Sequence, residues 1–401
     1  MSELIYLDHA ATTPVHPEVL EAMMPYFSEQ FANPSTLYQF GQQARAAVDE
    51  ARSKVAGLIG AETSEVFFTA GATESDNWAI IGVCQAKESK GKHIITSGIE
   101  HHAVLETCEF LQKRGWELTV LPVDGNGLVN PEDVRAAITD QTVLISIMHA
   151  NNEVGVIQPI VEIGAIAREK GVTFHTDATQ SVGHVKIDVN ELNVDLLSLS
   201  GHKLYGPKGI GALYVRKGTR ILPYLHGGAQ EANRRAGTLN VPGIVGLGKA
   251  AELAGATLES EAAREIRLRD RLIDGILGGI VDSRLNGDRV KRLPNNVNVS
   301  IQGIEGESMI LMLDMNGICV SSGSACTSGS LEASHVLLGL GLPHELAHGS
   351  LRMTLGRDNT EEHVNKVLEV LPKIVERLRA MSPVYGTCDA ECSCATDSSV
   401  E

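Results

Sequence analysis

The sequence predicts an α/β fold in which a large domain with a mainly parallel sheet is followed by a smaller α+β domain. Short apolar runs alternate with helix-patterned segments as far as about residue 255, which is typical of strands and helices in a parallel sheet. Beyond that point the alternation stops. With 401 residues, of which 43% are hydrophobic, the chain is long enough for two domains.

The apolar runs of the first part of the chain are expected to form the large sheet. Several are apolar throughout, as expected when helices cover both faces of a sheet. Helical segments such as "ESDNWAIIGVCQAKES" and "PIVEIGAIAREK" lie between them. In chain order the expected strands are "EVFFTA" (65–70), "KHIITSG" (92–98), "WELTVLPV" (116–123), "TVLISIMHA" (142–150), "VTFHTDA" (172–178), "VDLLSLS" (194–200) and "GALYV" (211–215).

The smaller domain is expected to begin with a charged helical run, "ESEAAREIRLRDRLIDGIL". "NNVNVSI" and "SLRMTLG" are then expected as strands, and the amphipathic "EEHVNKVLEVLPKIVERLRA" as a closing helix. The predicted division is 16–255 for the large domain, 1–15 with 256–385 for the small one, and a polar, disordered tail at 386–401.

Charge and cysteine content exclude several classes of function. A formal charge of -16 and a pI near 5.4 argue against nucleic acid or an anionic membrane as partner. The sequence has no apolar stretch long enough to span a bilayer, and its first residues lack the pattern of a signal peptide, so a cytoplasmic location is expected. The 7 cysteines are scattered and odd in number, which favours thiols over a disulfide framework.

Candidate ligand-binding residues follow five of the expected strands, where ligands of open α/β sheets bind. Each alone also fits a capped turn, a satisfied histidine or an Asx turn, but together they indicate a site. They are Ala72 and Thr73, His101 and His102, Asn152, Asp177 with Gln180, and Ser200, His202 and Lys203.

This set of side chains suits pyridoxal 5′-phosphate (PLP), which needs a lysine, a carboxylate, a phosphate cup and a flat group over its ring. A negative charge on Asp177 about 4 Å from the protonated ring nitrogen would attract it by ~4 kcal/mol. This attraction would raise the pKa of the nitrogen by roughly 3. Lys203, desolvated beside a cationic ring, would become a competent amine. A nucleotide-phosphate loop is excluded, because Pro207 stands where that motif requires lysine.

Motifs along nearly the whole chain resemble the NifS/IscS branch of PLP-dependent cysteine desulfurases, in the class-V aminotransferase family. They are "YLDHAATTP", "ANPST", "AGATESDN", "EHHAV", "NNEVG", "HTDATQS", "SGHKLYGPKGIGALYV", "SSGSACTSGS" and "SLRMTLGR". The resemblance implies the aminotransferase-like fold of type I PLP enzymes and a homodimer with active sites near the subunit interface. It also implies release of sulfur from L-cysteine, with alanine as co-product.

The resemblance also assigns roles by position. It implies Lys203 as the Schiff-base lysine, His101 over the ring and Asp177 on the ring nitrogen. The remaining implied roles are Gln180 and Asn152 near the phenolic oxygen, Ala72, Thr73, Ser200 and His202 in the phosphate cup, Thr238 lent by the partner subunit, and Asn33 and Arg352 on the substrate carboxylate. Arginine suits that task because its planar fork binds a carboxylate bidentately. His102 receives no role.

Cys326, in "VSSGSACTSGSLEASH", is the predicted sulfur acceptor. Its Ser, Gly and Ala neighbours favour a mobile loop, whereas Cys84, Cys108 and Cys319 lie among apolar residues and are expected to be structural. Attack by Cys326 would leave a persulfide on it, assisted by His101 or by the activated sulfur. The loop resembles the long-loop class, which implies transfer to a scaffold for iron–sulfur cluster assembly, with Cys326 as a shared cluster ligand.

Parts of the sequence depart from the family pattern. Ala229 and "EAN" stand where another glycine and "ERG" are usual, and Ala32 replaces a common glycine. In the tail, Cys388, Cys392 and Cys394 would supply only three metal ligands, so we favour a disordered tail over a sulfur relay.

Two other functions stay open at this point: a selenocysteine lyase or another PLP aminotransferase with the same cofactor residues, and a non-enzymatic sulfur carrier, which would not need Lys203. The sequence does not distinguish nitrogenase maturation (nitrogen fixation), general cluster assembly and tRNA thiolation as the destination of the sulfur.

Overall fold

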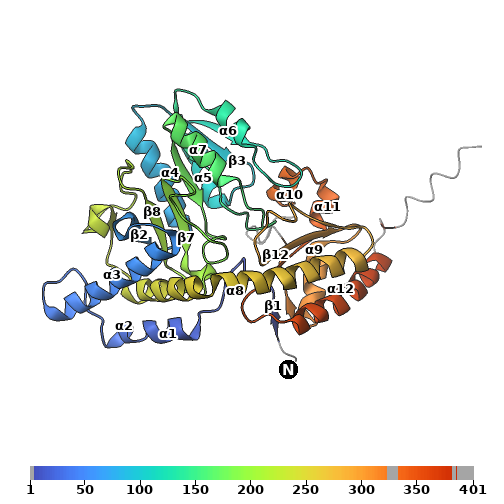
Figure 1. Cartoon of the computed structure of the whole chain (residues 1–401). Coiled ribbons are helices and arrows are strands. Elements are labelled where there is room, and N and C mark those ends of the chain that lie inside the picture. The colour runs from blue at the N-terminus through green and yellow to red at the C-terminus, as the bar shows by residue number, and fades with distance from the viewer. Residues whose placement is uncertain (1–3, 323–332, 382–384, 386–401) are drawn as a thin grey trace, which may run out of the picture.

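The computed structural model describes residues 4–322, 333–381 and 385 (Figure 1). Its centre is a seven-stranded sheet, which confirms the predicted α/β class. In spatial order the strands are β2 (Val66–Thr69), β8 (Gly211–Val215), β7 (Leu196–Ser200), β6 (Thr173–Asp177), β5 (Thr142–Ser146), β3 (His93–Ser97) and β4 (Glu117–Leu121). β8 is antiparallel to both of its neighbours, and the remaining pairs are parallel. Every expected strand of this sheet is present, several of them shorter than the apolar run that predicted them.

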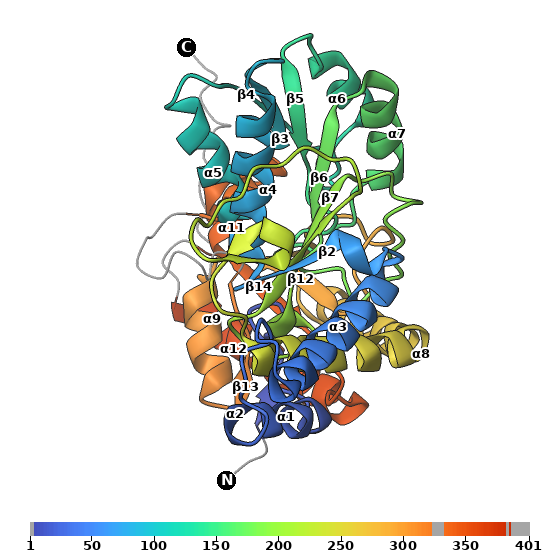
Figure 2. The same cartoon turned by 90° about the vertical axis from the view of Figure 1, so that its left-hand side faces the viewer.

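Helices cover both faces of the large sheet, as Figure 2 shows with α4 and α5 on one side and α6 and α7 on the other. Continuous apolar strands follow from this arrangement, because neither face meets water. α3 and α7 each end at a glycine, Gly60 and Gly171, in the left-handed conformation that glycine adopts at low cost. The bounds are α3 (Gln39–Ile59), α4 (Ala72–Lys87), α5 (His102–Gln112), α6 (Pro131–Ala137) and α7 (Ile160–Lys170).

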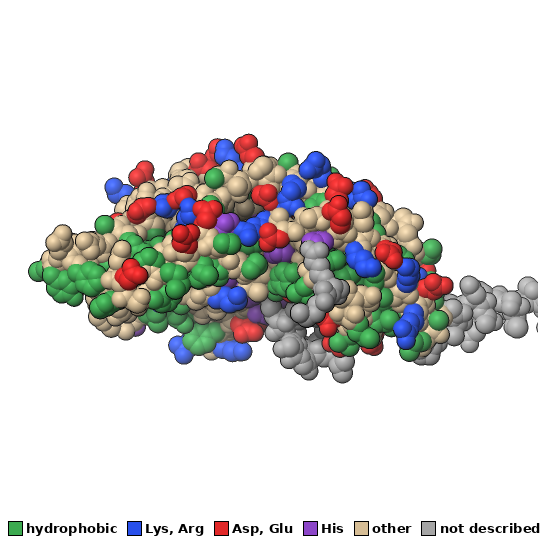
Figure 3. Space-filling model, turned by 90° about the horizontal axis from the view of Figure 1, so that it is seen from below, with side chains coloured by type: hydrophobic (Ala, Val, Ile, Leu, Met, Phe, Trp, Pro, Cys, Tyr) green, Lys and Arg blue, Asp and Glu red, His purple; other side chains and the backbone are tan. Residues whose placement is uncertain are grey.

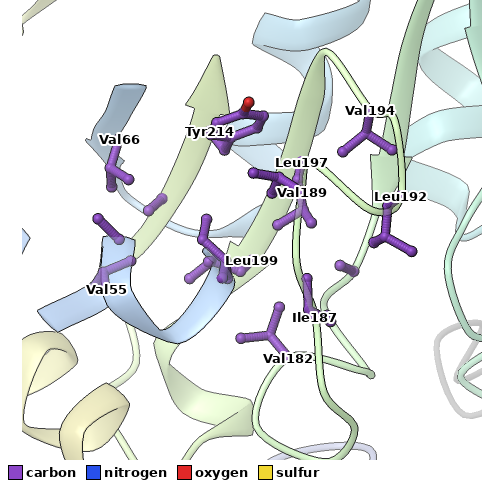
Figure 4. Close-up of a cluster of buried hydrophobic side chains, with 14 of the residues drawn as sticks. Val55, Val66, Val182, Ile187, Val189, Leu192, Val194, Leu197, Leu199 and Tyr214 are labelled. Carbon is purple, nitrogen blue, oxygen red and sulfur yellow. The ribbon is translucent and has the colours of Figure 1, made fainter. Parts of the chain in front are cut away.

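The main hydrophobic core lies between one face of the large sheet and the helices α3, α7 and α8 (Val241–Gly279). Figure 4 shows part of it, where Val55 of α3 lies near Val66 and Leu199 of the sheet. A second core fills the opposite face beneath α4 and α5, around Trp78. The sheet is therefore a rigid platform whose strand ends are held in register.

A small antiparallel sheet forms the other end of the molecule. Its order is β11 (Ser283–Leu285), β12 (Asn296–Ile301) and β14 (Ser350–Thr354). A separate core packs it against α8, α9 (Gly306–Asp314) and α12 (Glu361–Met381), and the N-terminal β1 (Ile5–Tyr6) pairs with β13 (Ile318–Cys319) beside it. The predicted strands and closing helix of this part are all present.

The helix α8 joins the two ends and runs the length of one side in Figure 1. Its 39 residues form one continuous helix, and the predicted domain boundary at 255–256 falls inside it. The change in sequence near residue 255 has a physical cause: buried side chains up to Ala251 belong to the large core, and those from Leu268 onward belong to the small one.

The remaining elements are short. They are α1 (Pro17–Met23), α2 (Pro25–Ser28), η1 (Thr63–Glu65), η2 (Gly201–Lys203), β9 (Ala229–Gln230), η3 (Glu231–Asn233), β10 (Arg235–Ala236), α10 (His335–Gly339) and α11 (His344–His348). Among the helices that the structure describes, none is both long and apolar enough to cross a membrane.

Candidate active site

The polar residues predicted to form a site follow strands that are neighbours in the large sheet. His101 follows β3, Asn152 follows β5, Asp177 ends β6, and Lys203 follows β7. Because β3, β5, β6 and β7 are adjacent and parallel, their carboxyl ends meet at one edge. The structure therefore brings these four residues to the same edge.

Asp177 is a buried carboxylate at this edge, with a relative exposure of 6%. Its Oδ1 accepts a hydrogen bond of 2.9 Å from the backbone N–H of Thr179, which fixes the carboxylate beyond the end of β6. A carboxylate held in this way suits the protonated nitrogen of a pyridine ring, because opposite charges attract strongly where water is scarce.

Lys203 ends the short helix η2, directly after β7. Its Nζ donates hydrogen bonds to the carbonyls of Ala10 and Ala11, the second at 2.7 Å. Gln180 Nε2 also donates to the Ala10 carbonyl, at 3.0 Å. The N-terminal segment around Ala10 thus closes one side of the site, a contact between residues distant in sequence that the motifs did not predict.

His202 is held by the same segment. Its Nδ1 lies 3.1 Å from Thr12 Oγ1, and its carbonyl accepts from both the N–H and the hydroxyl of Thr13, each at 3.0 Å. Burial lowers the pKa of His202 to about 4, and the positive charges of Lys203 and Lys208 add to the shift. The imidazole is therefore neutral at pH 7.

The N-terminus of α4 is open to an anion. Its N-cap is Gly71, and no side chain in the described part of the chain caps it, so Thr73 does not serve as a plain N-cap. Ala72 and Thr73 form the first turn, whose backbone N–H groups and dipole favour a phosphate. Ser200, 3% exposed, lies at the end of β7.

His101 begins the helix α5 as its N-cap, and its Nδ1 accepts from the N–H of Ala103 at 3.1 Å. Burial lowers the pKa of His101; Asp177 opposes the shift, while His102 and Lys203 add to it. A neutral imidazole whose Nδ1 is an acceptor carries its proton on Nε2. His101 can therefore offer a flat face and an N–H donor at the same time.

Arg352 reaches the edge from β14 of the small sheet and is 3% exposed. Its Nη2 donates to Asp8 Oδ1 at 2.9 Å, and its Nη1 donates to the carbonyl of Asn152 at 3.0 Å. Its Nε is buried and has no hydrogen-bond partner among the described residues. An arginine oriented in this way, with an unsatisfied donor, suits a carboxylate-bearing substrate.

Asn33 and Thr238 are exposed, as Thr73 is. Asn33 Oδ1 accepts from the N–H of Ser35 at 2.9 Å, which forms a local turn. Within the described part of the chain, neither residue has a hydrogen bond to another predicted site residue. Their roles stay predictions.

The predicted sulfur acceptor, Cys326, lies outside the described residues, as do Cys388, Cys392 and Cys394 of the tail. Cys84 and Cys108 are fully buried, as expected of structural thiols, and burial raises the pKa of both. Cys319 is half-buried. Over residues 4–322 and 333–381, no cluster of three or more His, Cys, Asp and Glu side chains is arranged to hold a metal ion.

Three acidic residues of the site were missed by sequence reasoning. Asp8 binds Arg352, while Glu100 and Glu153 are buried beside His101 and Asn152. Their sequence neighbours gave a signal, because each lies inside a motif, in "YLDHAATTP", "EHHAV" or "NNEVG". Their contacts join segments far apart in the chain, which the motifs alone do not reveal.

Comparison with known proteins gives a consistent result. Class-V aminotransferases match residues 5–367. A protein named cysteine desulfurase IscS from Methanosarcina thermophila is 60% identical over 96% of this chain and 95% of its own length. One named cysteine desulfurase IscS 1 from Archaeoglobus fulgidus is 50% identical over 95% of this chain and 99% of its own.

Solved structures agree. One described as a NifS-like protein is 38% identical, with a TM-score of 0.88, and covers 94% of this chain and 100% of its own. A structure of SspA in complex with cysteine is 40% identical, with a TM-score of 0.79, and covers 88% of this chain and 98% of its own.

Proposed function

Because the chain belongs to the class-V aminotransferase family, in its cysteine desulfurase branch, we propose that it converts L-cysteine to L-alanine and receives the sulfur on Cys326. The observation that carries this proposal is the edge of the large sheet where Lys203, Asp177 and His101 lie, together with Arg352 from the small sheet. The 60% identity to a protein named cysteine desulfurase supports it.

The described residues fit PLP as the cofactor. The uncapped N-terminus of α4 suits its phosphate, the buried Asp177 its ring nitrogen, and the Lys203 amine its aldehyde carbon. When bound there, PLP supplies an electron sink for the carbon atoms of the substrate.

The chain's own residues orient the substrate and move its protons. The guanidinium of Arg352 binds the carboxylate of L-cysteine, and Lys203 Nζ serves as the base and acid at the substrate carbons. His101, whose Nδ1 accepts from Ala103 and whose pKa is lowered by burial, would offer its flat face to the ring and its Nε2 proton to the sulfur. Asp177, buried at the end of β6, would hold the ring nitrogen of the cofactor.

The overall reaction balances with one thiol as acceptor. The C–S bond of L-cysteine breaks, an S–S bond to Cys326 forms, the thiol proton of Cys326 is released and the carbon takes up a proton to give alanine. The sulfur becomes a persulfide, and the electron pair that it leaves stays with the carbon. No outside oxidant or reductant is needed.

A test uses the purified PLP-loaded protein and its Cys326→Ala variant with L-cysteine under anaerobic conditions. We expect the parent to release alanine and carry a persulfide located to Cys326 by mass spectrometry, and the variant to keep the absorbance of bound PLP but lose turnover. Retention of most of the parental rate would favour a selenocysteine lyase, and a keto acid product would favour an aminotransferase.

A homodimer is the proposed assembly. Exposed apolar side chains gather over α1, α2 and the segment before α3, at the end of the molecule seen at the left of Figure 3. They are Leu20, Met24, Phe27, Phe31, Leu37 and Tyr38. The exposed Thr238, proposed to serve the PLP phosphate of a partner subunit, fits the same assembly. A sedimentation measurement that found a monomer at micromolar concentration would contradict it.

The destination of the sulfur is proposed to be a scaffold protein for iron–sulfur cluster assembly in the cytoplasm, with Cys326 as a shared cluster ligand during transfer. The names of the relatives, cysteine desulfurase IscS, support the sulfur-donating half of this proposal. Sulfide transfer from persulfide-loaded protein to an apo-scaffold, followed by cluster absorbance, tests the other half.

A further inference from the structure

The short helix α10 is attached to two turns of the candidate active site through its first residues. Ser334, its N-cap, contacts Glu153, which follows Asn152 in the turn after β5. His335, the next residue, contacts the backbone of Glu100, which precedes His101 in the turn after β3. Ser334 follows Cys326 by eight residues in the sequence, so α10 is the first described helix after the predicted sulfur acceptor.

Glu153 is the centre of the first attachment. Its carboxylate, in a residue 4% exposed, accepts a hydrogen bond from the hydroxyl of Ser334, and that hydroxyl in turn caps the N–H of Leu337 at 3.2 Å. The carbonyl of Glu153 accepts from the side-chain amides of Asn296 and Asn298 on β12, each at 3.1 Å. One residue therefore joins the site turn, α10 and the small sheet.

The second attachment involves only neutral groups. His335 Nε2 lies 3.0 Å from the carbonyl of Glu100, and because a carbonyl only accepts, Nε2 carries the proton. Burial lowers the pKa of His335, although this hydrogen bond opposes the shift. The ring of His335 packs against that of His102, with centroids 4.8 Å apart. This contact sets the orientation of α10 but does not change with pH near neutrality.

We infer that Glu153 is a positioning residue: through Ser334 it holds α10, whose N-cap lies eight residues after the predicted sulfur acceptor in the sequence, against the turn that carries Asn152. The inference rests on the proposed function, because it concerns delivery of sulfur to Cys326. The proposed action of Glu153 is through Ser334, without contact to the reacting atoms.

The charge of Glu153 makes the attachment sensitive to pH. Burial raises the pKa of Glu153 to about 7, while the hydrogen bond from Ser334 and the positive charge of Arg352 act in the opposite direction. The groups that face it are Ser334 from α10, Arg352 from β14 and the amides of Asn296 and Asn298 from β12. Above pH 7 the carboxylate accepts a charge-assisted hydrogen bond, which is stronger than the bond accepted by the protonated acid.

Four single variants of the PLP-loaded protein and one double variant test the inference. Ser334→Ala removes the donor, Ser334→Thr keeps a hydroxyl, Glu153→Gln keeps an acceptor without charge, and Ser283→Ala is a control that removes a hydroxyl donating to the carbonyl of Ile280 beside β11. For each we measure PLP absorbance, thermal midpoint, KM for L-cysteine, and the single-turnover rate of persulfide formation on Cys326.

We expect Ser334→Ala to slow persulfide formation about tenfold, the effect of losing one hydrogen bond to a charged group, with PLP absorbance and KM unchanged. Ser334→Thr should retain most of the rate, and Ser283→Ala all of it. In the parent the rate should fall as the pH decreases through about 7, and Glu153→Gln should lack this limb. Adding Ser334→Ala to Glu153→Gln should slow the reaction no further than Ser334→Ala alone.

Two results would overturn the inference: a parental rate in Ser334→Ala, or a loss of rate matched by lost PLP absorbance and a lowered thermal midpoint, which would make the contact structural. An acid limb retained in Glu153→Gln would assign it to another group and would also overturn the pH mechanism. Failure of the parent itself to form alanine would instead contradict the proposed function, so the two failures are distinguishable.

Discussion

Asp8 and Arg352 meet across 344 residues of sequence, and their pairing decides how the candidate site receives a carboxylate. The Nη2–Oδ1 distance is 2.9 Å, and the side chains are 4% exposed for Arg352 and 19% for Asp8. A pair this sheltered from water keeps more of its attraction than a surface pair. The contact fixes the plane of the guanidinium toward the edge where L-cysteine is proposed to bind.

Asp8→Asn should therefore raise the KM for L-cysteine by about tenfold with a smaller change in kcat, because the neutral amide holds Arg352 less firmly. Steady-state alanine production measures both constants. Asp274→Asn is the matched control, since Asp274 pairs with Arg289 at 2.7 Å where both side chains are exposed. A lowered KM in Asp8→Asn would mean that Asp8 competes with the substrate instead of orienting its binder.

Glu100 links the site to the pH dependence of stability. Burial raises its pKa to about 8, and hydrogen bonds from Ser97 and Met148 offset part of the shift. The pKa of Glu100 is higher in the folded than in the unfolded chain. Its contribution to the free energy of unfolding is therefore complete below the unfolded pKa near 4.5 and is lost as the pH rises to about 8. Ionisation at alkaline pH leaves a buried negative charge close to Asp177.

The free energy of unfolding, measured by urea at pH 6 and pH 8, should therefore fall in the parent by up to about 3 kcal/mol from this group. Glu100→Gln, which cannot ionise, should reduce that fall. Glu169→Gln is the control and should keep the parental slope, because the exposed Glu169 has its pKa lowered by Arg135. An identical slope in Glu100→Gln would show that the carboxylate is already ionised at pH 6.

At the scale of single residues, sequence reasoning located those side chains whose position follows from a strand end. Asp177 and Lys203 come directly after apolar runs, and a parallel sheet brings such ends together. The sequence did not predict three acidic residues, because their importance arises from contacts with distant residues. These contacts are Asp8 with Arg352, Glu100 with His335, and Glu153 with Ser334. Tertiary packing creates these contacts, and no local pattern encodes them.

The element η3 explains a departure from the family pattern. Glu231, Ala232 and Asn233 all have positive φ angles, of 46°, 54° and 65°. Asparagine tolerates this conformation better than most residues, so it replaces the glycine of the usual "ERG" at modest cost. The backbone strain at Glu231 is offset by two hydrogen bonds of 2.6 and 2.8 Å that Arg52 donates to its carboxylate. Sequence reasoning noted the departure but had no backbone angle with which to explain it.

The helices α3 and α8 pack closely because of a small residue at their contact. A Cβ at Gly248 would lie 2.6 Å from both the Cα and the Cβ of Ala51, so these helices would have to separate. Gly255, on the same helix, has its nearest such atom at 3.6 Å and is exposed. The two glycines therefore differ in packing while sharing the same helical backbone.

Gly248→Ala should lower the free energy of unfolding by about 1–3 kcal/mol through overpacking, whereas Gly255→Ala should raise it by up to about 1 kcal/mol because alanine favours the helix. Chemical denaturation of both variants measures the difference. Equal effects in the two variants would show that the contact between α3 and α8 relaxes without cost.

For the whole molecule, the sequence predicted the sheet strands and the order of the two parts, because apolar runs and amphipathic periods are local. It did not predict that one helix extends from one core to the other. The two ends of α8 pack against different cores while its helical hydrogen bonds continue unbroken. Residues 252–264 of α8 contain no buried side chain, while both flanks do. This stretch of α8 is the rigid link between Lys203 and Asp177 on the large sheet and Arg352 on the small one.

A proline in that link should disturb the site without removing any of its residues. Ala256 is exposed, and Ala256→Pro would remove a helical hydrogen bond and clash with the carbonyl one turn earlier, at a cost of about 3 kcal/mol. The resulting kink would move Arg352 relative to Lys203. The KM for L-cysteine should therefore rise by a larger factor than that by which the PLP absorbance falls. Ala256→Gly, the control, should cost only about 1 kcal/mol and keep the parental KM, since glycine weakens the helix without bending it. If Ala256→Pro kept the parental KM while its thermal midpoint fell, the contacts between the two ends of the molecule would fix the site by themselves, and the straightness of α8 would serve stability alone.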